Sequence, residues 1–172
     1  GNLLVGRNFD FYVNDEFAQN KIVEFITPKD GYKYASVTWP GMVGVVSGMN
    51  MQGLTVTLNA GKSDIPLRGK TPVSIVARTI LQYAKNIEEA IAIARQFQVF
   101  VAESFLVGSA YDNKAVVIEM SPKKIDFYDT SNGKLICTNH FQSAAYKTDK
   151  RNQNQITDSH SHYRFEKLDE SF

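Results

Sequence analysis

The chain of 172 residues has few of the residues that build cross-linked, metal-bound or membrane-spanning proteins. Its single cysteine, Cys137, excludes an intramolecular disulfide, and its three histidines have no cysteine partners for a structural zinc site. No apolar run approaches the roughly 18 residues that cross a bilayer, and no stretch has the pattern of a signal peptide. The sequence leaves the compartment open.

An excess of charge of one sign is also lacking. Nineteen basic and 18 acidic residues leave a net charge of +1, so no strong field favours nucleic acid or an anionic membrane as a partner. Hydrophobic residues make up 43% of the chain and charged residues 22%, which is typical of a folded protein. We therefore expect a single domain over residues 1–172 with small or neutral partners.

Apolar and β-branched segments predict strands on both sides of a helical region. The expected strands are residues 3–9, 21–27, 32–39, 43–47, 54–58, 105–110, 115–120, 125–128 and 135–138. Asn50, in the turn between two of these strands, is expected for its tolerance of left-handed backbone. Glu119 lies in an apolar strand and needs a partner if it is buried.

Two amphipathic helices are expected between the two groups of strands. Thr71 as N-cap and Pro72 at the first helical position predict a helix that ends near Tyr83. Asn86 and Glu89 form a capping-box pattern for a second helix through Phe97. Polar residues 147–162 predict a long surface loop, and residues 163–172 have helical spacing. This order predicts an α+β fold of two antiparallel sheets with helices packed outside them.

A dense polar cluster follows the apolar start of the chain, in the sequence Gly-Arg-Asn-Phe-Asp at residues 6–10. On a regular strand, Arg7 and Asp10 would point to opposite faces, so a bend or a shared polar pocket must bring them together. A structural ion pair at a strand end is the alternative to a functional site.

Four motifs in one order carry a family resemblance. They are residues 6–10, the sequence Gly-Met-Asn-Met-Gln-Gly-Leu at 48–54 with Leu-Asn at 58–59, Ala-Val-Val-Ile-Glu at 115–119 with Ser-Pro at 121–122, and Cys-Thr-Asn-His-Phe at 137–141. Together they resemble the cysteine N-terminal-nucleophile (Ntn) hydrolases. The chain is most similar to the penicillin acyltransferase-like branch, whose relatives include bile-salt hydrolase, penicillin V acylase and acid ceramidase.

The resemblance implies an αββα sandwich and a hydrolase or acyltransferase that acts on small N-acyl amides or acyl donors without a metal or cofactor. In the family an amino-terminal cysteine is the nucleophile and its own α-amine is the base. Arg7 would lie against the sulfur, and Asp10 would orient the amine. Asn59, through its backbone N–H, and Asn139, through its side-chain amide, would form the oxyanion hole, with Arg164 nearby.

The resemblance places the nucleophile on a segment before Arg7, where this sequence has no cysteine. We therefore expect an incomplete fold that lacks the nucleophile segment and a C-terminal part, and a chain that is inactive as printed. Unpaired sheet edges would then favour self-association into a homo-oligomer. The alternative function is a non-catalytic binding or scaffold module with the same fold.

Simpler roles remain open for the other polar residues. Asn59 and Asn139 each follow a strand, where asparagine commonly ends the strand through local hydrogen bonds. Cys137 and His140 suggest a thiol–imidazole pair, but their side chains would diverge on an extended chain, and a lone cysteine in an apolar strand is usually a small buried hydrophobe. His160 and His162 are expected to be solvated surface residues.

Overall fold

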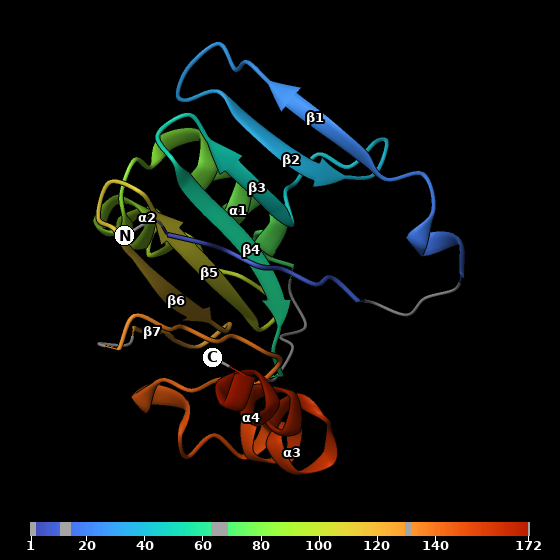
Figure 1. Ribbon diagram of the computed structural model, residues 1–172, viewed down its shortest axis with the longest axis vertical. Helices are drawn as coiled ribbons and strands as arrows, with labels where there is room; N and C mark the ends of the chain where they lie inside the picture. Colours follow the sequence, from blue (N-terminus) through green and yellow to red (C-terminus); the bar gives the residue numbers. More distant parts are fainter. Residues whose placement is uncertain (1–2, 11–14, 63–68, 130–131, 172) are drawn as a thin grey trace.

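The computed structural model describes residues 3–10, 15–62, 69–129 and 132–171. In these ranges the strands form one seven-stranded antiparallel sheet in the order β1-β2-β3-β4-β5-β6-β7 (Figure 1). The strands are β1 (Ile22–Ile26), β2 (Tyr34–Thr38), β3 (Ser47–Asn50), β4 (Leu54–Ala60), β5 (Glu103–Ser109), β6 (Lys114–Met120) and β7 (Ile125–Tyr128). Neighbours in the sheet are neighbours in the chain.

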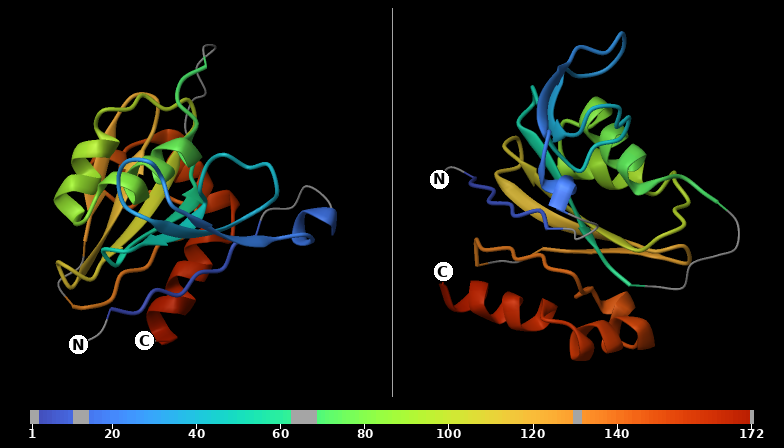
Figure 2. Two further views of the ribbon diagram at one scale, coloured as in Figure 1. Left: turned by 90° about the horizontal axis from the view of Figure 1, so that it is seen from above. Right: turned by 90° about the vertical axis from the view of Figure 1, so that its right-hand side faces the viewer.

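Two helices connect β4 to β5 and cover one face of the sheet. They are α1 (Val73–Tyr83) and α2 (Ile87–Ala94). Both lie on the side of the sheet opposite the N-terminal segment (Figure 2). The apolar residues Leu54, Val56, Phe105 and Val107 are fully buried with the inner faces of the helices. This layer is the hydrophobic core, and it holds β4 beside β5 although a long helical connection separates them in the chain.

The opposite face of the sheet is crossed by residues 3–10, which make no strand pairing. Gly108 of β5 permits this close approach, because a Cβ there would lie 3.1 Å from both Leu3 and Val5 and 2.7 Å from Thr55 Oγ1. The N-terminal segment therefore packs on the sheet with its side chains. The predicted strand over residues 3–9 is wrong, because Leu3 and Val5 pack against the sheet face at Gly108 and the segment pairs with no edge, while Leu4 is 89% exposed.

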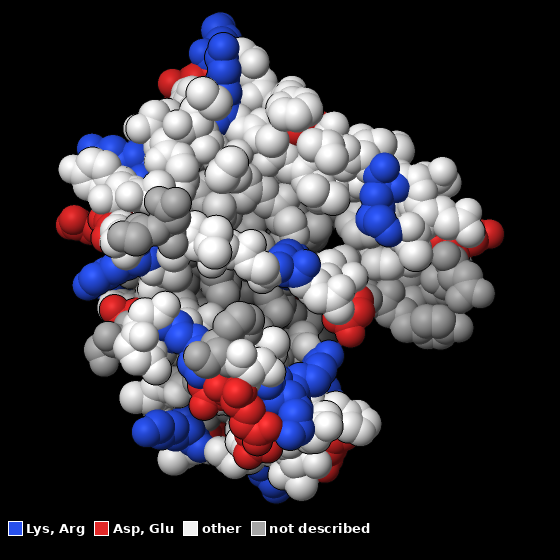
Figure 3. Space-filling model, in the orientation of Figure 1, with Lys and Arg blue, Asp and Glu red and all other residues white. Residues whose placement is uncertain are grey.

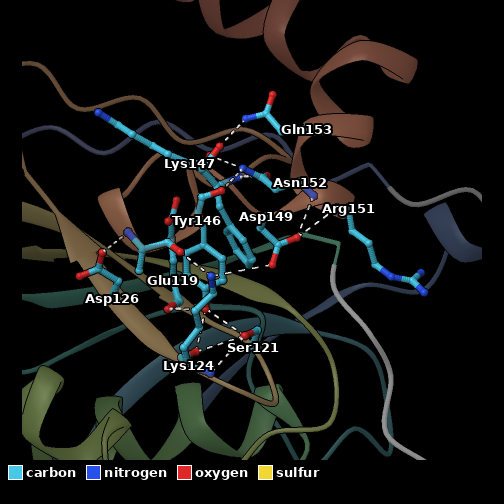
Figure 4. A network of polar contacts seen from close by, with 12 residues as sticks. Glu119, Ser121, Lys124, Asp126, Tyr146, Lys147, Asp149, Arg151, Asn152 and Gln153 are labelled. Atoms are coloured by element: carbon cyan, nitrogen blue, oxygen red, sulfur yellow. Dashed lines mark hydrogen bonds and ion pairs between the residues drawn. The ribbon is translucent and has the colours of Figure 1, made fainter.

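The C-terminal part docks at the β6–β7 edge (Figure 1). It contains the short 3-10 helix η2 (Ala144–Tyr146), then α3 (Lys150–Asp158) and α4 (Ser161–Ser171); a further 3-10 helix, η1 (Asp15–Ala18), precedes β1. Tyr146 is fully buried, its hydroxyl donates to the Lys124 carbonyl at 2.7 Å, and the Lys124 ammonium lies 4.4 Å from the centre of its ring (Figure 4). Asp149 caps α3 by accepting from the N–H groups of Arg151 and Asn152.

The molecular surface is uneven. On the face shown in Figure 3, charges of both signs gather over α3 and α4, and the surface over β1 to β4 is largely uncharged. Apolar side chains of β1 to β3 are exposed, including Val23 at 60%, Phe25 at 82% and Met49 at 55%. Within the described ranges, every helix is too short or too polar to span a membrane.

The predicted α+β class and antiparallel strands are confirmed. All described strands join one sheet, however, because β4 and β5 pair directly through seven residue pairs and link the two predicted groups of strands. Residues 135–138 and most of 43–47 form no strand, and the predicted loop over 147–162 contains α3. Ser-Asn-Gly at residues 131–133 predicts a turn between the last two expected strands, and residue 131 lies outside the described residues.

The helix boundaries follow most of the sequence signals. The first helix ends at Tyr83 as predicted, but its N-cap is Pro72, without a side-chain hydrogen bond, and Thr71 instead bridges to Val99. Asn86 caps α2 as predicted by accepting from Glu89 N at 2.9 Å. The Glu89 carboxylate accepts from Lys85 N, one residue before the position of a standard capping box, and α2 ends at Ala94 rather than Phe97.

Candidate active site

The C-terminal end of β4 receives Arg7 from the segment that crosses the sheet. Arg7 Nη1 donates to the Leu58 carbonyl at 2.8 Å and lies 3.4 Å from Asn59 Oδ1. Its Nε and Nη2 atoms are buried and have no hydrogen-bond partner within the described part of the chain. The guanidinium also lies over the Phe9 ring, 4.6 Å from the ring centre. Arg7 is thus fixed at one nitrogen and keeps unused donors, which a ligand or a neighbouring anion can accept.

A second group of bonds reaches the same end of β4. Asn139 Nδ2 donates to the Ala60 carbonyl at 3.0 Å, and Asn139 Oδ1 accepts from Arg164 Nη2 at 2.8 Å. Arg164 Nη1 in turn lies 3.4 Å from Asp10 Oδ2. Arg164 comes from α4 and Asp10 from the N-terminal segment, so the ion pair links the two ends of the described chain.

Two chains of contacts therefore reach the end of β4. Arg7 contacts Asn59 directly. Asn139 contacts Ala60, Arg164 contacts Asn139, and Asp10 contacts Arg164. The direct Arg7–Asp10 ion pair considered above is wrong, because the carboxylate of Asp10 pairs with Arg164 instead. Asn59 Nδ2 also lies 3.5 Å from the Cys137 carbonyl, so its side chain contacts both the N-terminal segment and the segment that precedes Asn139. Asn59 lies within β4, whereas the sequence suggested that it follows the strand.

The environment of Arg7 favours contact with an anion. Burial lowers the pKa of Arg7, whereas the nearby Cys137, Glu103 and Asp10 raise it. A guanidinium stays protonated under these influences at neutral pH. The charge therefore remains available beside β4, where it would stabilise a thiolate or a carboxylate.

The thiol of Cys137 is poorly suited to act as a nucleophile. Burial raises its pKa to about 12, and the charge of Glu119 contributes in the same direction. Deprotonation is therefore strongly disfavoured at neutral pH. Its thiol also lacks the imidazole partner considered above, because His140 Nδ1 contacts Ser161 Oγ at 2.9 Å and Thr138 Oγ1 at 3.2 Å. Burial lowers the pKa of His140 to about 4, and His162 contributes, so the ring is neutral at pH 7.

A polar row that the sequence analysis missed crosses the same face of the sheet. Its members are register partners on four adjacent strands: Asn59, Ser104, Glu119 and Asp126. Alternation within each strand could have suggested a shared face, but only the register shows that they align. Sequence analysis also missed Glu103, at the start of β5 opposite Ala60. Among the described residues, no group of three or more His, Cys, Asp or Glu side chains could hold a metal ion.

Glu103 should make stability depend on pH. Burial raises the pKa of Glu103 to about 8, and Arg7 opposes the shift. In the unfolded chain a glutamate titrates near ~4.3, so between these values the folded state keeps a proton that the unfolded state releases. The contribution of protonated Glu103 to the free energy of unfolding is complete below pH ~4.3, and it is lost as pH rises through about 8.

We therefore expect Glu103→Gln to flatten the decline in the free energy of unfolding between about pH 4 and pH 8. Urea unfolding at several pH values measures this slope. Glu88→Gln, on the exposed side of α2, is the matched control and should leave the slope as in the unmodified protein. An unchanged slope in Glu103→Gln would show that this carboxyl is not the group responsible.

The fold is that of the Ntn-type amide hydrolases and acyltransferases. The Caenorhabditis elegans ortholog of N-acylethanolamine-hydrolyzing acid amidase aligns with a TM-score of 0.62 at 21% identity, over 89% of this chain and 71% of that one. Two variants of conjugated bile acid hydrolase from Clostridium perfringens align with TM-scores of 0.53 and 0.55 at 16% identity, over 76% of this chain and 48% of theirs.

Sequence comparison gives the family. Residues 1–171 match the family described as acyl-coenzyme A:6-aminopenicillanic acid acyl-transferase, and the chain belongs to it. An uncharacterized protein from Archaeoglobus fulgidus is 29% identical over 133 residues, which are 72% of this chain and 21% of that protein. The chain thus spans about a fifth of the length of this relative. The predicted resemblance to the penicillin acyltransferase-like branch is confirmed.

Proposed function

We propose that the cluster at the end of β4 belongs to a cysteine-dependent amide hydrolase or acyltransferase that acts on a small N-acyl amide at a carbon–nitrogen bond outside peptides. The observation that supports it most is the set of contacts that links Arg7 to Asn59, and Asp10 through Arg164 and Asn139 to Ala60. Each of these side chains comes from a motif of the family resemblance or from the C-terminal helix, and separate segments carry them there.

The reaction proceeds in two steps. The sulfur of an amino-terminal cysteine attacks the carbonyl carbon, the C–N bond breaks, and the thiol proton passes through the α-amine to the departing nitrogen. This gives an acyl thioester and a free amine. Water then adds to the thioester, which releases the carboxylic acid and restores the thiol; an amine in place of water forms a new amide.

The cluster suits this chemistry. The unused donors of Arg7 would stabilise the thiolate, and Asp10 would orient the α-amine while paired with Arg164. One proton of the Asn139 amide is used by the Ala60 carbonyl, which leaves the other for an oxyanion. The backbone N–H of Asn59 is not the second donor, because it faces Ser104 in the β4–β5 ladder: Gly61 N donates to the Ala102 carbonyl, and hydrogen-bonded pairs alternate along an antiparallel ladder. The nucleophile in this proposal is not Cys137, so the 172-residue chain alone would be inactive.

Turnover of chromogenic N-acyl p-nitroanilides of varied acyl length tests the proposal. We expect the natural full-length protein to release p-nitroaniline, its Cys137→Ser variant to keep kcat within about twofold, and the 172-residue chain to release none. Loss of turnover in Cys137→Ser, or turnover by the 172-residue chain, would contradict the mechanism. Binding of these amides without cleavage by the full-length protein would favour a non-catalytic binding module.

A further inference from the structure

The segment that carries Asn139 has no regular secondary structure, yet buried side chains hold its backbone. Residues 139–143 lie between the end of the sheet and α3 and belong to no helix or strand. Backbone N–H groups removed from water need acceptors, and no ladder or helix supplies them here. The acceptors come from three side chains that are almost fully buried: Glu119 at 0% exposure, Asn152 at 1% and Ser161 at 0%.

Glu119 of β6 holds the far end of this segment. Its Oε1 accepts from Gln142 N at 2.7 Å, and its Oε2 accepts from Ser143 N at 3.0 Å and from Ser143 Oγ at 2.6 Å. An ionised carboxylate has acceptors only, and here each contact can supply a donor. Burial raises the pKa of Glu119, whereas the hydrogen bonds from Ser143 and Gln142 lower it. This contact is the partner that the sequence could not supply for a buried Glu119.

The other two side chains extend the support to Asn139 itself. Asn152 of α3 accepts from Phe141 N at 2.7 Å and donates to the Phe141 carbonyl at 2.9 Å. Ser161, at the start of α4, accepts from Asn139 N at 2.7 Å. Each support comes from a different element, so the backbone from 139 to 143 is fixed at successive points. Figure 4 places Glu119 and Asn152 on opposite sides of Tyr146.

We infer that Glu119 is a positioning residue for Asn139: by fixing the backbone at Gln142 and Ser143, it sets the place of the Asn139 amide beside Ala60 and Arg164. The inference rests on the proposed function for its catalytic consequence, but not for the anchoring itself. A purely structural glutamate would stabilise the fold without changing the geometry of Asn139. Two measurements therefore distinguish the positioning role of Glu119 from a purely structural one: the amide signal of the Asn139 side chain and kcat.

Three variants distinguish the loss of the Glu119 hydrogen bonds to Gln142 and Ser143 from a general loss of charge. Glu119→Gln keeps the size of the side chain but places an NH₂ group against N–H donors. Ser143→Ala is the milder variant, since it removes only the hydroxyl contact and leaves both backbone donors on Glu119. Glu88→Gln is the matched control, because it makes the same chemical change at an exposed position of α2, outside the 139–143 segment.

The first readout is the side-chain amide signal of Asn139 in the natural full-length protein labelled with ¹⁵N-asparagine, identified by its loss in Asn139→Ala. Glu119→Gln should move this signal toward the position of a free asparagine amide and speed its proton exchange. Ser143→Ala should move it part of the way, and Glu88→Gln should leave it in place. An unmoved signal in folded Glu119→Gln and Ser143→Ala would overturn the inference.

The second readout is kcat on N-acyl p-nitroanilides, normalised to the fraction of enzyme that forms an acyl adduct. Glu119→Gln should lower kcat by about 10- to 100-fold with KM within about twofold, because misplacement of a transition-state donor affects the chemical step. If Asn139→Ala lowers kcat but Glu119→Gln does not, the inference is wrong. If Asn139→Ala leaves kcat unchanged, the proposed function fails, and the amide signal alone decides the anchoring.

Discussion

Replacing Asn139 with alanine is expected to lower kcat of the natural full-length protein on N-acyl p-nitroanilides by about 10²- to 10³-fold. The reason is that the Asn139 amide would donate to the oxyanion, a contact that strengthens only in the transition state. KM should change little, because the ground-state carbonyl carries less charge. Steady-state kinetics on a chromogenic amide measures both constants.

The Asn139 variant needs a control for loss of structure. Asn139 also bonds the Ala60 carbonyl and Arg164, so its removal loosens the contact between α4 and the sheet. Asn154→Ala, at an exposed position of α3, is the matched asparagine substitution and should keep kcat unchanged. A normal kcat in Asn139→Ala would exclude the amide as an oxyanion donor and leave it a structural role at the strand end.

Replacing Asn50 with alanine is expected to lower the free energy of unfolding by about 2–4 kcal/mol. Asn50 is 3% exposed, and its amide uses its full hydrogen-bonding capacity. Nδ2 donates to the carbonyls of Leu81 and Ala84 at 2.9 and 2.7 Å. Oδ1 accepts from Gln52 N and Leu54 N, both at 3.0 Å. Alanine would leave these backbone groups buried without partners.

Urea unfolding at neutral pH measures this loss, with the exposed Asn154→Ala as the control that should stay within about 0.5 kcal/mol of the unmodified protein. A similarly small change in Asn50→Ala would mean that water replaces the lost contacts. The result also separates two roles for this residue. The sequence predicted a turn residue with left-handed backbone, but Asn50 is not among the residues with positive φ. Its side chain instead ties the end of α1 to the β3–β4 turn.

Local signals predicted the parts of the fold where pattern and packing agree. The strand Ile125–Tyr128 matches the prediction to the residue, and α1 ends at Tyr83, near which the sequence predicted its end. The segment 3–9 has strand composition but packs across the sheet face, a choice that only tertiary contacts decide. The helix α3 was missed because Lys150–Asp158 is polar along most of its length and shows no apolar periodicity.

The order of the sequence motifs was the only basis for predicting the residues of the candidate site. Resemblance selected Arg7, Asp10, Asn59, Asn139 and Arg164, and contacts link each of them to the end of β4 directly or through a neighbour; their catalytic roles stay a prediction. Spacing alone could not show that Asp10 pairs with Arg164, 154 residues away in the sequence. Nor could it show the support from Glu119 and Ser161, because both act on backbone groups far along the chain. Long-range hydrogen bonds of this kind leave no local pattern in a sequence.

The most direct test of the central claim is the intact mass of the natural full-length protein, quenched in acid shortly after mixing with an N-acyl p-nitroanilide. The account predicts a mass increase equal to the acyl group, on a cysteine at the amino terminus, and a much smaller acylated fraction in Asn139→Ala. Peptide mapping locates the adduct. An adduct on Cys137, or release of p-nitroaniline with no acyl adduct at any quench time, would contradict the account.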